Sequence, residues 1–343
     1  MAVATKTYGV AIIGTGRISG AHARAAQNVA NARLVAASEI DEARGKQFAE
    51  KWGVAVVTDY KELLKRDDID IVALTLPHWL HMPIGVEAMN AGKHVLVEKP
   101  MADSVEECDI MIEASRRNGV KLFTGHTEQF LAPNVEARRL IESGEVGDVV
   151  MIADCWYKAF ALHTRPPWFL DREKGGGMWL MNGAHMIDRI TFIAGRNVKA
   201  VKAFVGTRYN QIKADDAAMA FLELEGGIPA SIAHTGYKDK PGAGVEQGGG
   251  EIIISCTEAM LKVDNRRRLY RSAPGGRRGG GEWQEVELRP VDTASLELQK
   301  LIENIERNEP ETVRVEQARH IVAAMTACEE SSQTGREVVL PSD

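Results

Sequence analysis

The chain has 343 residues, a net charge of −6 at pH 7, 44% apolar residues and 26% charged residues. This length is too great for one ordinary hydrophobic core, and the average composition excludes disordered and fibrous proteins, so we expect two compact domains. The negative charge gives no field that attracts phosphate backbones, so we expect a small-molecule partner and no nucleic acid.

The four cysteines are far apart in the sequence and form no CxxC or Cys/His pattern of metal-binding spacing. We expect them to be buried thiols and predict no metal site. The first residues enter a strand pattern directly, and no apolar run of about 18 residues occurs, so we expect no membrane partner and a cytoplasmic location.

From residue 8 to residue 126, short β-branched runs alternate with amphipathic helical stretches. The expected strands are YGVAIIG, RLVAASE, VAVVT, DIVALTLP, HVLVEKP and KLFTGH. Strands that are apolar on both faces predict a parallel sheet covered by helices on each side. Ser104 and Glu107 form a capping box at the start of one helix, and Gly119 marks its end. Residues 1–126 are therefore predicted to form a doubly wound α/β domain.

After residue 126 the pattern changes to a helix, a strand, a second helix and then several strands in succession. These strands are AVKAFVGT, AAMAFLELEGG, IPASIAHTG, EIIISCT, AMLKV and WQEVELRP. They favour an α+β domain over residues 127–343 with a large, mostly antiparallel open sheet and helices on one face. Two late helices and the short strand EVVL follow, and we leave open whether the last helix and strand return to the first domain.

The stretch VAIIGTGRISGAH has the context of a dinucleotide-binding turn, because its glycines follow the first strand and precede a helix. Gly14 permits the tight turn, and Gly16 lets the backbone approach a pyrophosphate. The helix beginning near Ile18 directs its N–H groups toward that anion. Ser19 takes the third position, where a serine makes the match incomplete. The predicted cofactor contacts in this turn are Gly14, Thr15, Gly16, Arg17 and Ile18.

Glu39 ends the second predicted strand, about 20–25 residues downstream of the glycine turn. Its carboxylate can accept hydrogen bonds from both hydroxyls of an adenosine ribose and would repel a 2′-phosphate. We therefore predict NAD as the cofactor in preference to NADP, with Arg17 and Arg44 as the cations that could offset the repulsion. The alternative is a plain glycine turn with a surface glutamate.

Two further strands end in polar or proline-bearing turns, at TLPHWLHMP and HVLVEKPM. Ligands of open α/β sheets bind outside the carboxyl ends of the strands. Lys99 is therefore expected to present its ammonium to the reactive ring of the cofactor, with Glu98 fixing nearby groups and Pro100 bending the chain. The alternative is a plain charged turn. The remaining predicted cofactor contacts are Thr75, Pro77, His81, Glu98 and Lys99.

Together these motifs resemble the Gfo/Idh/MocA oxidoreductase family. The matching stretches are Gly14-Thr15-Gly16, Ala91-Gly92-Lys93-His94-Val95, Glu98-Lys99-Pro100, TLPHWLHMP and LIESGEVGDV. The resemblance covers nearly the whole chain and implies an N-terminal Rossmann domain and a C-terminal domain that binds substrate through an open sheet. It also implies that Lys99 contacts nicotinamide and substrate, that the Lys99–Pro100 bond is cis, and that a homo-oligomer, dimer or tetramer, forms through the C-terminal sheet.

The stretch GGGMWLMNGAHMID resembles the family's second motif, GGGxxxDxGxHxxD, with His185 and Asp188 in place. Met181 stands at the usual aspartate position and cannot relay a proton, so the sequence leaves open what replaces that group. A histidine, with an ordinary pKa of about 6.5, suits a general base, and Lys99 would stabilise the forming alkoxide. The alternative for His185 is a helix residue satisfied by Asp188.

The predicted catalytic residues are Lys99 and His185, and both are expected to reach the substrate over the cofactor ring. Asn182, Tyr157 and Trp168 complete the predicted substrate contacts, with a helix cap as the alternative for Asn182 and loop packing for the other two. We predict oxidation of a secondary alcohol of a sugar, an inositol or a related cyclic polyol. The open alternatives are a dihydrodiol or other non-sugar cyclic alcohol, which a site lined by Trp, Met and Phe would favour, and a non-catalytic NAD- or sugar-binding regulatory protein.

Overall fold

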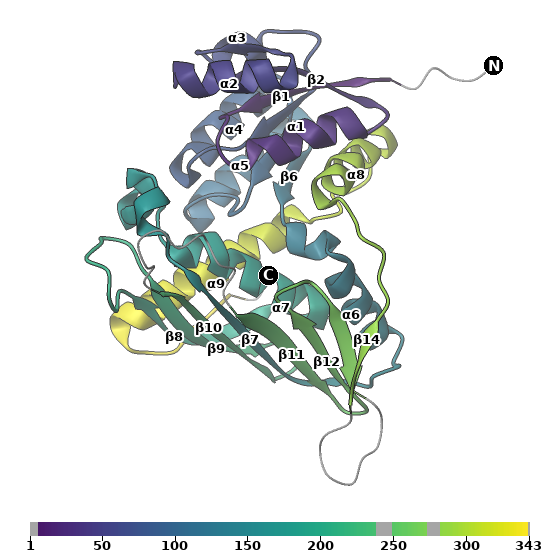
Figure 1. Ribbon diagram of the computed structural model, residues 1–343, viewed down its shortest axis with the longest axis vertical. Helices are drawn as coiled ribbons and strands as arrows, with labels where there is room; N and C mark the ends of the chain where they lie inside the picture. The colour runs from purple at the N-terminus through teal and green to yellow at the C-terminus, as the bar shows by residue number, and fades with distance from the viewer. Residues whose placement is uncertain (1–5, 238–248, 273–281, 342–343) are drawn as a thin grey trace, which may run out of the picture. The chain divides into compact units, whose positions relative to one another are not determined.

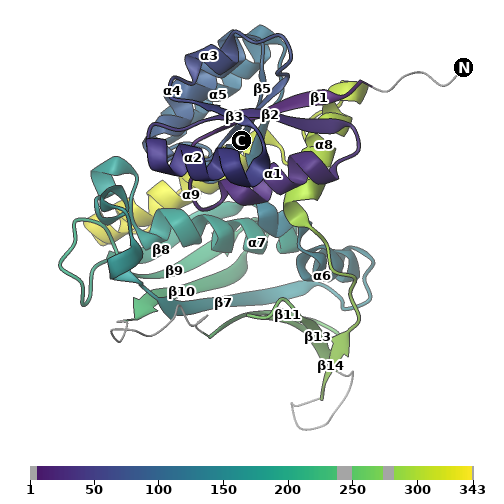
Figure 2. The ribbon, with the colours of Figure 1, turned by 45° about the horizontal axis from the view of Figure 1, so that its top comes forward.

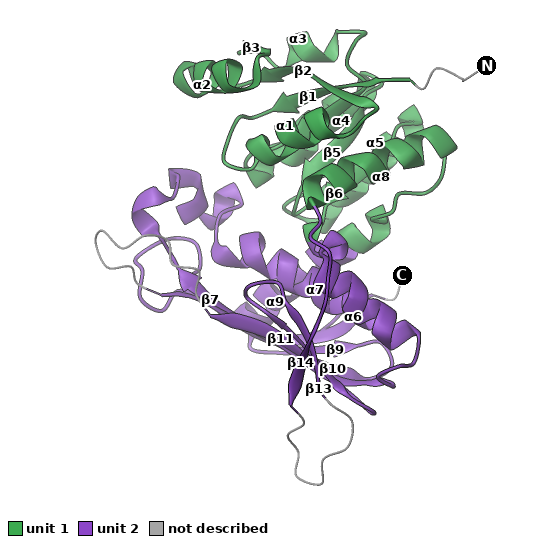
Figure 3. Cartoon of the chain, turned by 45° about the vertical axis from the view of Figure 1, so that its right-hand side comes forward, with its two compact units in different colours: residues 1–127, 292–319 green, residues 128–291, 320–343 purple. Residues whose placement is uncertain are grey.

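The structure is a computed structural model that describes residues 6–237, 249–272 and 282–341. It divides into two compact units, coloured separately in Figure 3. Unit 1 contains residues 1–127 and 292–319, and unit 2 contains residues 128–291 and 320–343. The return of residues 292–319 to unit 1 differs from the single boundary after residue 126 in the sequence interpretation. Each unit is described by itself.

Unit 1 contains a six-stranded parallel sheet in the order β3-β2-β1-β4-β5-β6. Strands β1, β2 and β6 of this sheet are labelled in Figure 1. Every residue of its two central strands is buried, because helices cover both faces of the sheet. The predicted doubly wound Rossmann sheet is confirmed. Its strands are β1 (Tyr8–Ile13), β2 (Ala32–Ser38), β3 (Ala55–Val57), β4 (Ile71–Leu74), β5 (His94–Glu98) and β6 (Leu122–Gly125).

The helices of unit 1 are α1 (Ser19–Asn28), α2 (Glu42–Trp52), α3 (Lys61–Leu64), α4 (His81–Asn90), α5 (Val105–Asn118) and α8 (Thr293–Arg307). Helices α1 and α2 lie on one face of the sheet, and α4 and α5 lie on the other (Figure 2). Helix α8 packs beside α1, where Asn31 Nδ2 donates a 3.1 Å hydrogen bond to Glu306 Oε1. This contact explains why residues 292–319 belong to unit 1.

The predicted capping box of α5 is present with one difference. Ser104 Oγ accepts a 3.2 Å hydrogen bond from the Glu107 amide, as expected for an N-cap. The Glu107 side chain accepts a 3.1 Å bond from the Asp103 amide, one residue earlier than the usual reciprocal bond. Gly119 ends the helix in the left-handed region at φ 65°, the conformation that favours glycine.

Unit 2 contains a nine-stranded sheet in the order β14-β13-β12-β11-β7-β10-β9-β8-β15. Strands β7 and β10 pair in parallel, and the other pairs are antiparallel, which confirms the predicted mostly antiparallel sheet. Strand β13 was not predicted. The strands are β7 (Val149–Ala159), β8 (Val198–Gly206), β9 (Ala217–Leu224), β10 (Ile228–Tyr237), β11 (Gly250–Cys256), β12 (Met260–Asp264), β13 (Leu269–Ser272), β14 (Trp283–Val286) and β15 (Val338–Val339).

One face of this sheet carries the core of unit 2. Helices α6 (Ala132–Glu142), α7 (Ala184–Ala194) and α9 (Val315–Thr334) lie on that face (Figure 2). Burial alternates along β9, as expected for a strand with one covered face, so that Leu222 is buried while Phe221 is exposed. Trp179 is fully buried in the core, and its indole N–H donates a 3.1 Å bond to the Met325 carbonyl. Strand β15 pairs with β8, so the last strand stays in unit 2.

A π-helical turn, η6 (Trp179–Gly183), leads into α7 and is held by a buried carboxyl group. Asp215 Oδ1 accepts a 2.8 Å hydrogen bond from the Trp179 amide. A side chain at Gly177, which has φ +113°, would collide with the other oxygen of Asp215. The third glycine of the GGG run therefore allows Asp215 to reach the start of this turn.

We expect Asp215 to make unit 2 less stable as the pH rises. Burial raises the pKa of this carboxyl from 3.8 to about 7, so the folded chain holds a proton that the unfolded chain releases between those values. The free energy of unfolding should therefore fall across that interval, by at most on the order of 1.4 kcal/mol per pH unit. Asp215→Asn keeps an acceptor for Trp179 and should flatten this dependence in urea denaturation at pH 5 and pH 7.5. An equally steep fall in the variant would contradict the assignment.

Candidate functional site

The glycine turn of unit 1 lies at the point where the strand order reverses, between β1 and β4. Gly14 follows β1 and has φ +89°, and a β-carbon there would approach the Thr75 carbonyl oxygen to 2.7 Å, so the position requires glycine. The Thr75 hydroxyl donates to the Gly14 carbonyl and ties the ends of the two strands together. A β-carbon at Gly16 would have that same Thr75 oxygen as its nearest neighbour, at 3.9 Å. The turn is thus open on the side that a pyrophosphate needs.

Glu39, at the end of β2, is hydrogen-bonded to the glycine turn. Its Oε2 accepts bonds from the amide of Thr15 at 2.8 Å and from the hydroxyl of Thr15 at 2.9 Å. Its Oε1 accepts from Arg44 Nη2 at 2.9 Å and from the Asp41 amide at 3.0 Å. Burial would raise the pKa of Glu39, but these hydrogen bonds outweigh it and hold the pKa below its ordinary value. These bonds hold the Glu39 carboxylate against the glycine turn at the carboxyl end of β2.

The rest of the turn shows how a serine fits the third position of the fingerprint. Ser19 is buried at the start of α1, and its hydroxyl donates a 2.6 Å bond to the Gly16 carbonyl. The hydroxyl group of Ser19 therefore stabilises the glycine turn through this hydrogen bond. Ile18 is the N-cap residue, and the side chains of Arg17 and Ile18 are exposed beside the turn.

The end of β5 carries the charged pair that the sequence singled out. Glu98 Oε1 accepts a 2.7 Å bond from His22 Nε2 of α1. Burial would raise the pKa of Glu98, but the bond from His22 and the positive charge of Lys99 outweigh it, so the pKa is lowered. Lys99 is half-buried, and the Lys99–Pro100 peptide bond is cis, as the resemblance implied.

His81 and Pro77 belong to the turn after β4. His81 is fully buried, and its ring nitrogens Nδ1 and Nε2 lie 2.9 Å and 3.0 Å from the carbonyl oxygens of Pro100 and Leu76. Burial lowers the pKa of this imidazole. The ring of His81 thus lies between the two strand-end turns and supports them, and its contact with the cofactor stays a prediction. Pro77 is half-buried and precedes a short 3-10 turn, η1 (His78–Leu80).

In unit 2, His185 lies in the first turn of α7, directly after η6. Its side chain is 17% exposed, and its Nδ1 lies 3.9 Å from Glu128 Oε1. The Trp156 ring of β7 lies beside it, with ring centroids 6.2 Å apart. His185 thus has a partly accessible ring between a carboxylate and an indole.

Asn182 is held in one orientation by a chain of hydrogen bonds. Burial lowers the pKa of His234 to about 3, so this imidazole is neutral. Its Nδ1 lies 2.6 Å from the Trp156 carbonyl and must donate to it, which leaves Nε2 to accept from Asn182 Nδ2 at 3.1 Å. Asn182 Oδ1 then accepts a 2.7 Å bond from Lys158 Nζ. Asn182 therefore lies inside η6, and Gly183, not Asn182, is the N-cap of α7.

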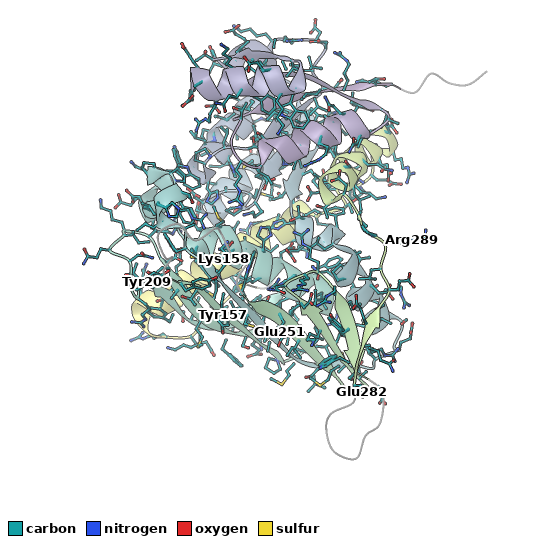
Figure 4. The ribbon with its side chains drawn as sticks, viewed as in Figure 1. Tyr157, Lys158, Tyr209, Glu251, Glu282 and Arg289 are labelled. Carbon is teal, nitrogen blue, oxygen red and sulfur yellow. The ribbon has the colours of Figure 1, made fainter. Side chains whose placement is uncertain are left out.

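Tyr157 does not join these groups. Successive side chains of a strand point to opposite faces, and Figure 4 shows Lys158 on the α7 side of β7 and Tyr157 on the outer side. Tyr157 is exposed and lines a hollow on the outer face with Phe204, Arg208 and Met219. Tyr157 and Lys158 thus point to opposite faces of the sheet, and the substrate contact of Tyr157 stays a prediction.

Met181 lies in apolar surroundings, which accounts for a thioether at this position. It packs against the cluster of Phe160, Phe169 and Met178, and Trp168 borders the same cluster. Arg165 Nη1 lies 3.7 Å from the Met181 sulfur, and its guanidinium lies 4.4 Å from the centroid of the Phe169 ring. Neither the sulfur nor these neighbours could take a proton from His185. Trp168 packs against this cluster, as its alternative interpretation of loop packing predicts. Its contact with the substrate stays a prediction.

Four side chains around His185 were missed from the sequence: Glu128, Trp156, Lys158 and His234. Alternation along β7 could have found two of them, because it places residues 156 and 158 on one face and residue 157 on the other. The ring nitrogens of His234 are both satisfied, one by the Trp156 carbonyl and the other by Asn182, which His234 thereby orients. Nothing local marks Glu128.

Two further observations concern the described residues alone. Within residues 6–237, 249–272 and 282–341, no three His, Cys, Asp or Glu side chains are grouped so that they could bind a metal ion. In the same segments, every helix is too short or too polar to cross a bilayer.

Family models match both parts of the chain. Residues 8–126 match an oxidoreductase family with an NAD-binding Rossmann fold, and residues 134–262 match the Gfo/Idh/MocA C-terminal domain. The chain is 34% identical over 60% of its length to the 1-carboxy-3-chloro-3,4-dihydroxycyclo hexa-1,5-diene dehydrogenase of Comamonas testosteroni. That match covers 52% of the relative, so the chain spans about half of its length.

Two other comparisons extend over the whole chain. The inositol 2-dehydrogenase of Salmonella typhimurium is 24% identical, with 98% of each chain covered. The crystal structure of an oxidoreductase domain protein from Kribbella flavida has the same fold, with a TM-score of 0.88 at 21% identity over 98% of this chain and 100% of that one. The chain therefore belongs to the Gfo/Idh/MocA family of NAD(P)-dependent oxidoreductases, with an NAD-binding Rossmann domain over residues 8–126.

Proposed function

We propose that the protein is an NAD-dependent dehydrogenase that oxidises a secondary alcohol of a sugar, an inositol or a related cyclic polyol. The observation that carries the proposal is that the chain keeps both proton-handling groups of its motifs. Lys99 follows β5 beside the cis bond, and His185 opens α7 with a partly accessible ring. When bound, NAD⁺ supplies the hydride acceptor. The inositol dehydrogenase from Salmonella, which matches the full length, supports a polyol substrate.

The residues that would hold NAD belong to unit 1. The open turn at Gly14 and Gly16 and the amino end of α1 suit the pyrophosphate, because backbone N–H groups and the helix dipole favour an anion there. The lowered pKa of Glu39 keeps it ionised, so it can accept from ribose hydroxyls and would repel a 2′-phosphate. Arg44, the nearby cation, already donates to Glu39. These features favour NAD over NADP.

His185 and Lys99 have different roles in this proposal. His185 accepts the proton of the substrate hydroxyl as a general base, a role worth roughly 10²–10⁴-fold in rate. Lys99 donates a hydrogen bond to the same oxygen and stabilises its developing negative charge. Asn182, fixed through His234 and Lys158, is suited to hold a second polar group of the substrate.

A second candidate substrate is a dihydrodiol or another cyclic alcohol with fewer hydroxyl groups. The apolar cluster around Met181 favours it, because a sugar needs polar partners along most of its edge. The Comamonas relative, named for a dihydroxycyclohexadiene, supports the same candidate. A non-catalytic regulatory protein is the third possibility, which Lys99 and His185 argue against.

A second copy of the chain is the partner that we propose for the outer face of the nine-stranded sheet. That face exposes a set of large apolar side chains: Met151, Tyr157, Met219, Phe221 and Tyr237. Met219 is 63% exposed and Phe221 is 52% exposed, on adjacent outward positions of β9. Contiguous apolar patches of this kind are typical of interfaces, and a self-complementary sheet face suits a symmetric dimer or tetramer.

Removing the charge of Glu39 should change which cofactor the protein prefers. Glu39→Gln keeps the size of the side chain but removes the repulsion of a 2′-phosphate and weakens the acceptor for ribose. We expect the ratio of the dissociation constants of NADPH and NADH to move toward NADPH by roughly 10-fold or more. Fluorescence titration measures it, with Glu50→Gln on the exposed side of α2 as the control. An unchanged ratio would remove Glu39 from cofactor discrimination.

The activity is tested by absorbance at the NADH band, with NAD⁺ and NADP⁺ offered against sugars, inositols and cyclic diols. We expect NADH formation with a cyclic secondary alcohol, and the preferred class decides between the two substrate candidates. His185→Ala and Lys99→Ala should each lower kcat by roughly 10²–10⁴-fold, because a base or an oxyanion donor is lost. Values within about threefold of the unchanged protein would refute these roles, and NAD binding without any turnover would favour the regulatory alternative.

The assembly is tested by light scattering after size-exclusion chromatography. A charge at the centre of the outer sheet face should prevent association, because burying an unpaired carboxylate is costly. We expect Met219→Glu with Phe221→Glu to give monomers where the unchanged chain gives a dimer or tetramer. Ile110→Glu, at an exposed apolar position of α5, is the control and should leave the mass unchanged. A monomeric unchanged protein would overturn the proposal.

A further inference from the structure

We propose that Glu128 is the positioning residue of His185: it fixes the tautomer of the imidazole and stabilises the imidazolium that forms when His185 accepts a proton. The inference rests on the proposed function, in which His185 is the base. Its geometric basis is the 3.9 Å separation between Glu128 Oε1 and His185 Nδ1 in unit 2. Met181, one helical turn before His185, has a thioether and cannot provide this carboxylate.

Glu128 is held so that one of its oxygens is directed at His185. It lies in the 3-10 turn η2 (Thr127–Phe130), and its side chain is buried. Asn134, buried in the first turn of α6, donates a 2.9 Å bond to Glu128 Oε2 and a 2.8 Å bond to the Glu128 carbonyl. One carboxylate oxygen is thus fixed by an amide, and the other, Oε1, is the oxygen that approaches the imidazole.

A second contact attaches the same turn to the helix that carries His185. Gln129 Nε2 donates a 2.7 Å bond to Asp188 Oδ1, one helical turn after His185 on α7. Because residues 128 and 129 are consecutive, this bond fixes the position of η2 against α7 and with it the distance from Glu128 to the imidazole. Two independent hydrogen-bonded contacts, from α6 and α7, therefore set the geometry of the pair.

The charges that face Glu128 come from α7 and from the segment after β12. Arg189 of α7 is the strongest, and its guanidinium is already paired with Asp154 of β7. The negative charge of Asp188 of α7 raises the pKa of Glu128, and the positive charge of Arg267, after β12, lowers it. Burial raises the pKa of Glu128, and the positive charge of Arg189 and the bond from Asn134 oppose this rise. Arg189, Arg267 and the bond from Asn134 therefore favour the ionised form of Glu128, which is the form that the proposal needs.

The role of His185 as a base depends on which of its ring nitrogens faces Glu128, and that nitrogen is Nδ1. A proton on Nδ1 is favoured by the nearby Oε1, so Nε2 is left bare to accept the proton of a substrate hydroxyl. When Glu128 is ionised, the imidazolium that results carries its positive charge beside an anion, which lowers its free energy. The separation of 3.9 Å exceeds a hydrogen bond, but such contacts shorten when the imidazole becomes charged or the substrate binds. No atom of Glu128 needs to touch the substrate.

The test is the titration of His185 followed by NMR, a measurement that does not depend on turnover. The chain has nine histidines, and the His185 signal is the one lost in His185→Ala. Glu128→Gln keeps the shape and an acceptor for Asn134 but removes the charge. We expect the pKa of His185 to be lower by about one unit in this variant, and the lower pKa of the kcat/KM profile to fall with it. Glu142→Gln, at the exposed end of α6, removes the same charge and should change neither.

The outcomes separate this inference from the proposed function. If His185→Ala abolishes turnover while Glu128→Gln leaves the titration and the pH profile unchanged, Glu128 is not the positioning residue. If His185→Ala retains turnover, the proposed function fails, and the titration still decides whether the two groups are paired. Should Glu128→Gln not fold, Glu128→Asp keeps the charge one methylene farther away. In Glu128→Asp the pKa of His185 should be lower than in the unchanged protein. An unchanged pKa of His185 in the folded variant would overturn the inference.

Discussion

The structure of unit 1 depends on a topological constraint: parallel strands cannot be joined by hairpins, so every connection returns across a face of the sheet. The carboxyl ends of all six strands therefore lie at the same edge of the sheet. Between β1 and β4 the strand order reverses, so the connections that follow these two strands run to opposite faces of the sheet. Two strand ends meet there without a helix crossing them. The hydroxyl of Thr75 and the carbonyl of Gly14 join these ends directly. The glycine turn that we propose for the cofactor lies at these two strand ends.

The cofactor half could be predicted because its signals are local. Gly14 needs a positive φ, which only the turn itself imposes, and Glu39 and Lys99 are recognisable as polar residues at the ends of apolar strands. Even here, the partners of each group were beyond prediction. The bond from Thr15 to Glu39 and the enclosure of His81 by two carbonyls depend on how separate strand ends meet in space.

The surroundings of His185 were harder to predict because the residues there come from distant segments. Asn182 was predicted to contact the substrate, with a helix cap as the alternative; the π-helical turn places it before the N-cap Gly183 and within 3.1 Å of His234, 52 residues later. Tyr157 was predicted to contact the substrate, but it is its neighbour Lys158 that reaches Asn182, because successive residues of β7 point to opposite faces of the sheet. Glu128 approaches His185 only because Gln129 and Asn134 fix the turn that carries it.

The start of α7 separates two environments, and this separation bears on the substrate. On one side of the helix start, Trp156 lies beside His185, His234 and the ammonium of Lys158, so polar groups surround an indole face. On the other side, Met181 packs among aromatic rings. Under the proposed function, a ring with hydroxyls along one edge and hydrocarbon along the other satisfies both environments. A hydroxyl that faces Met181 would meet mainly apolar groups, with the Arg165 guanidinium as the polar neighbour, so this side favours a cyclic diol over a fully hydroxylated sugar.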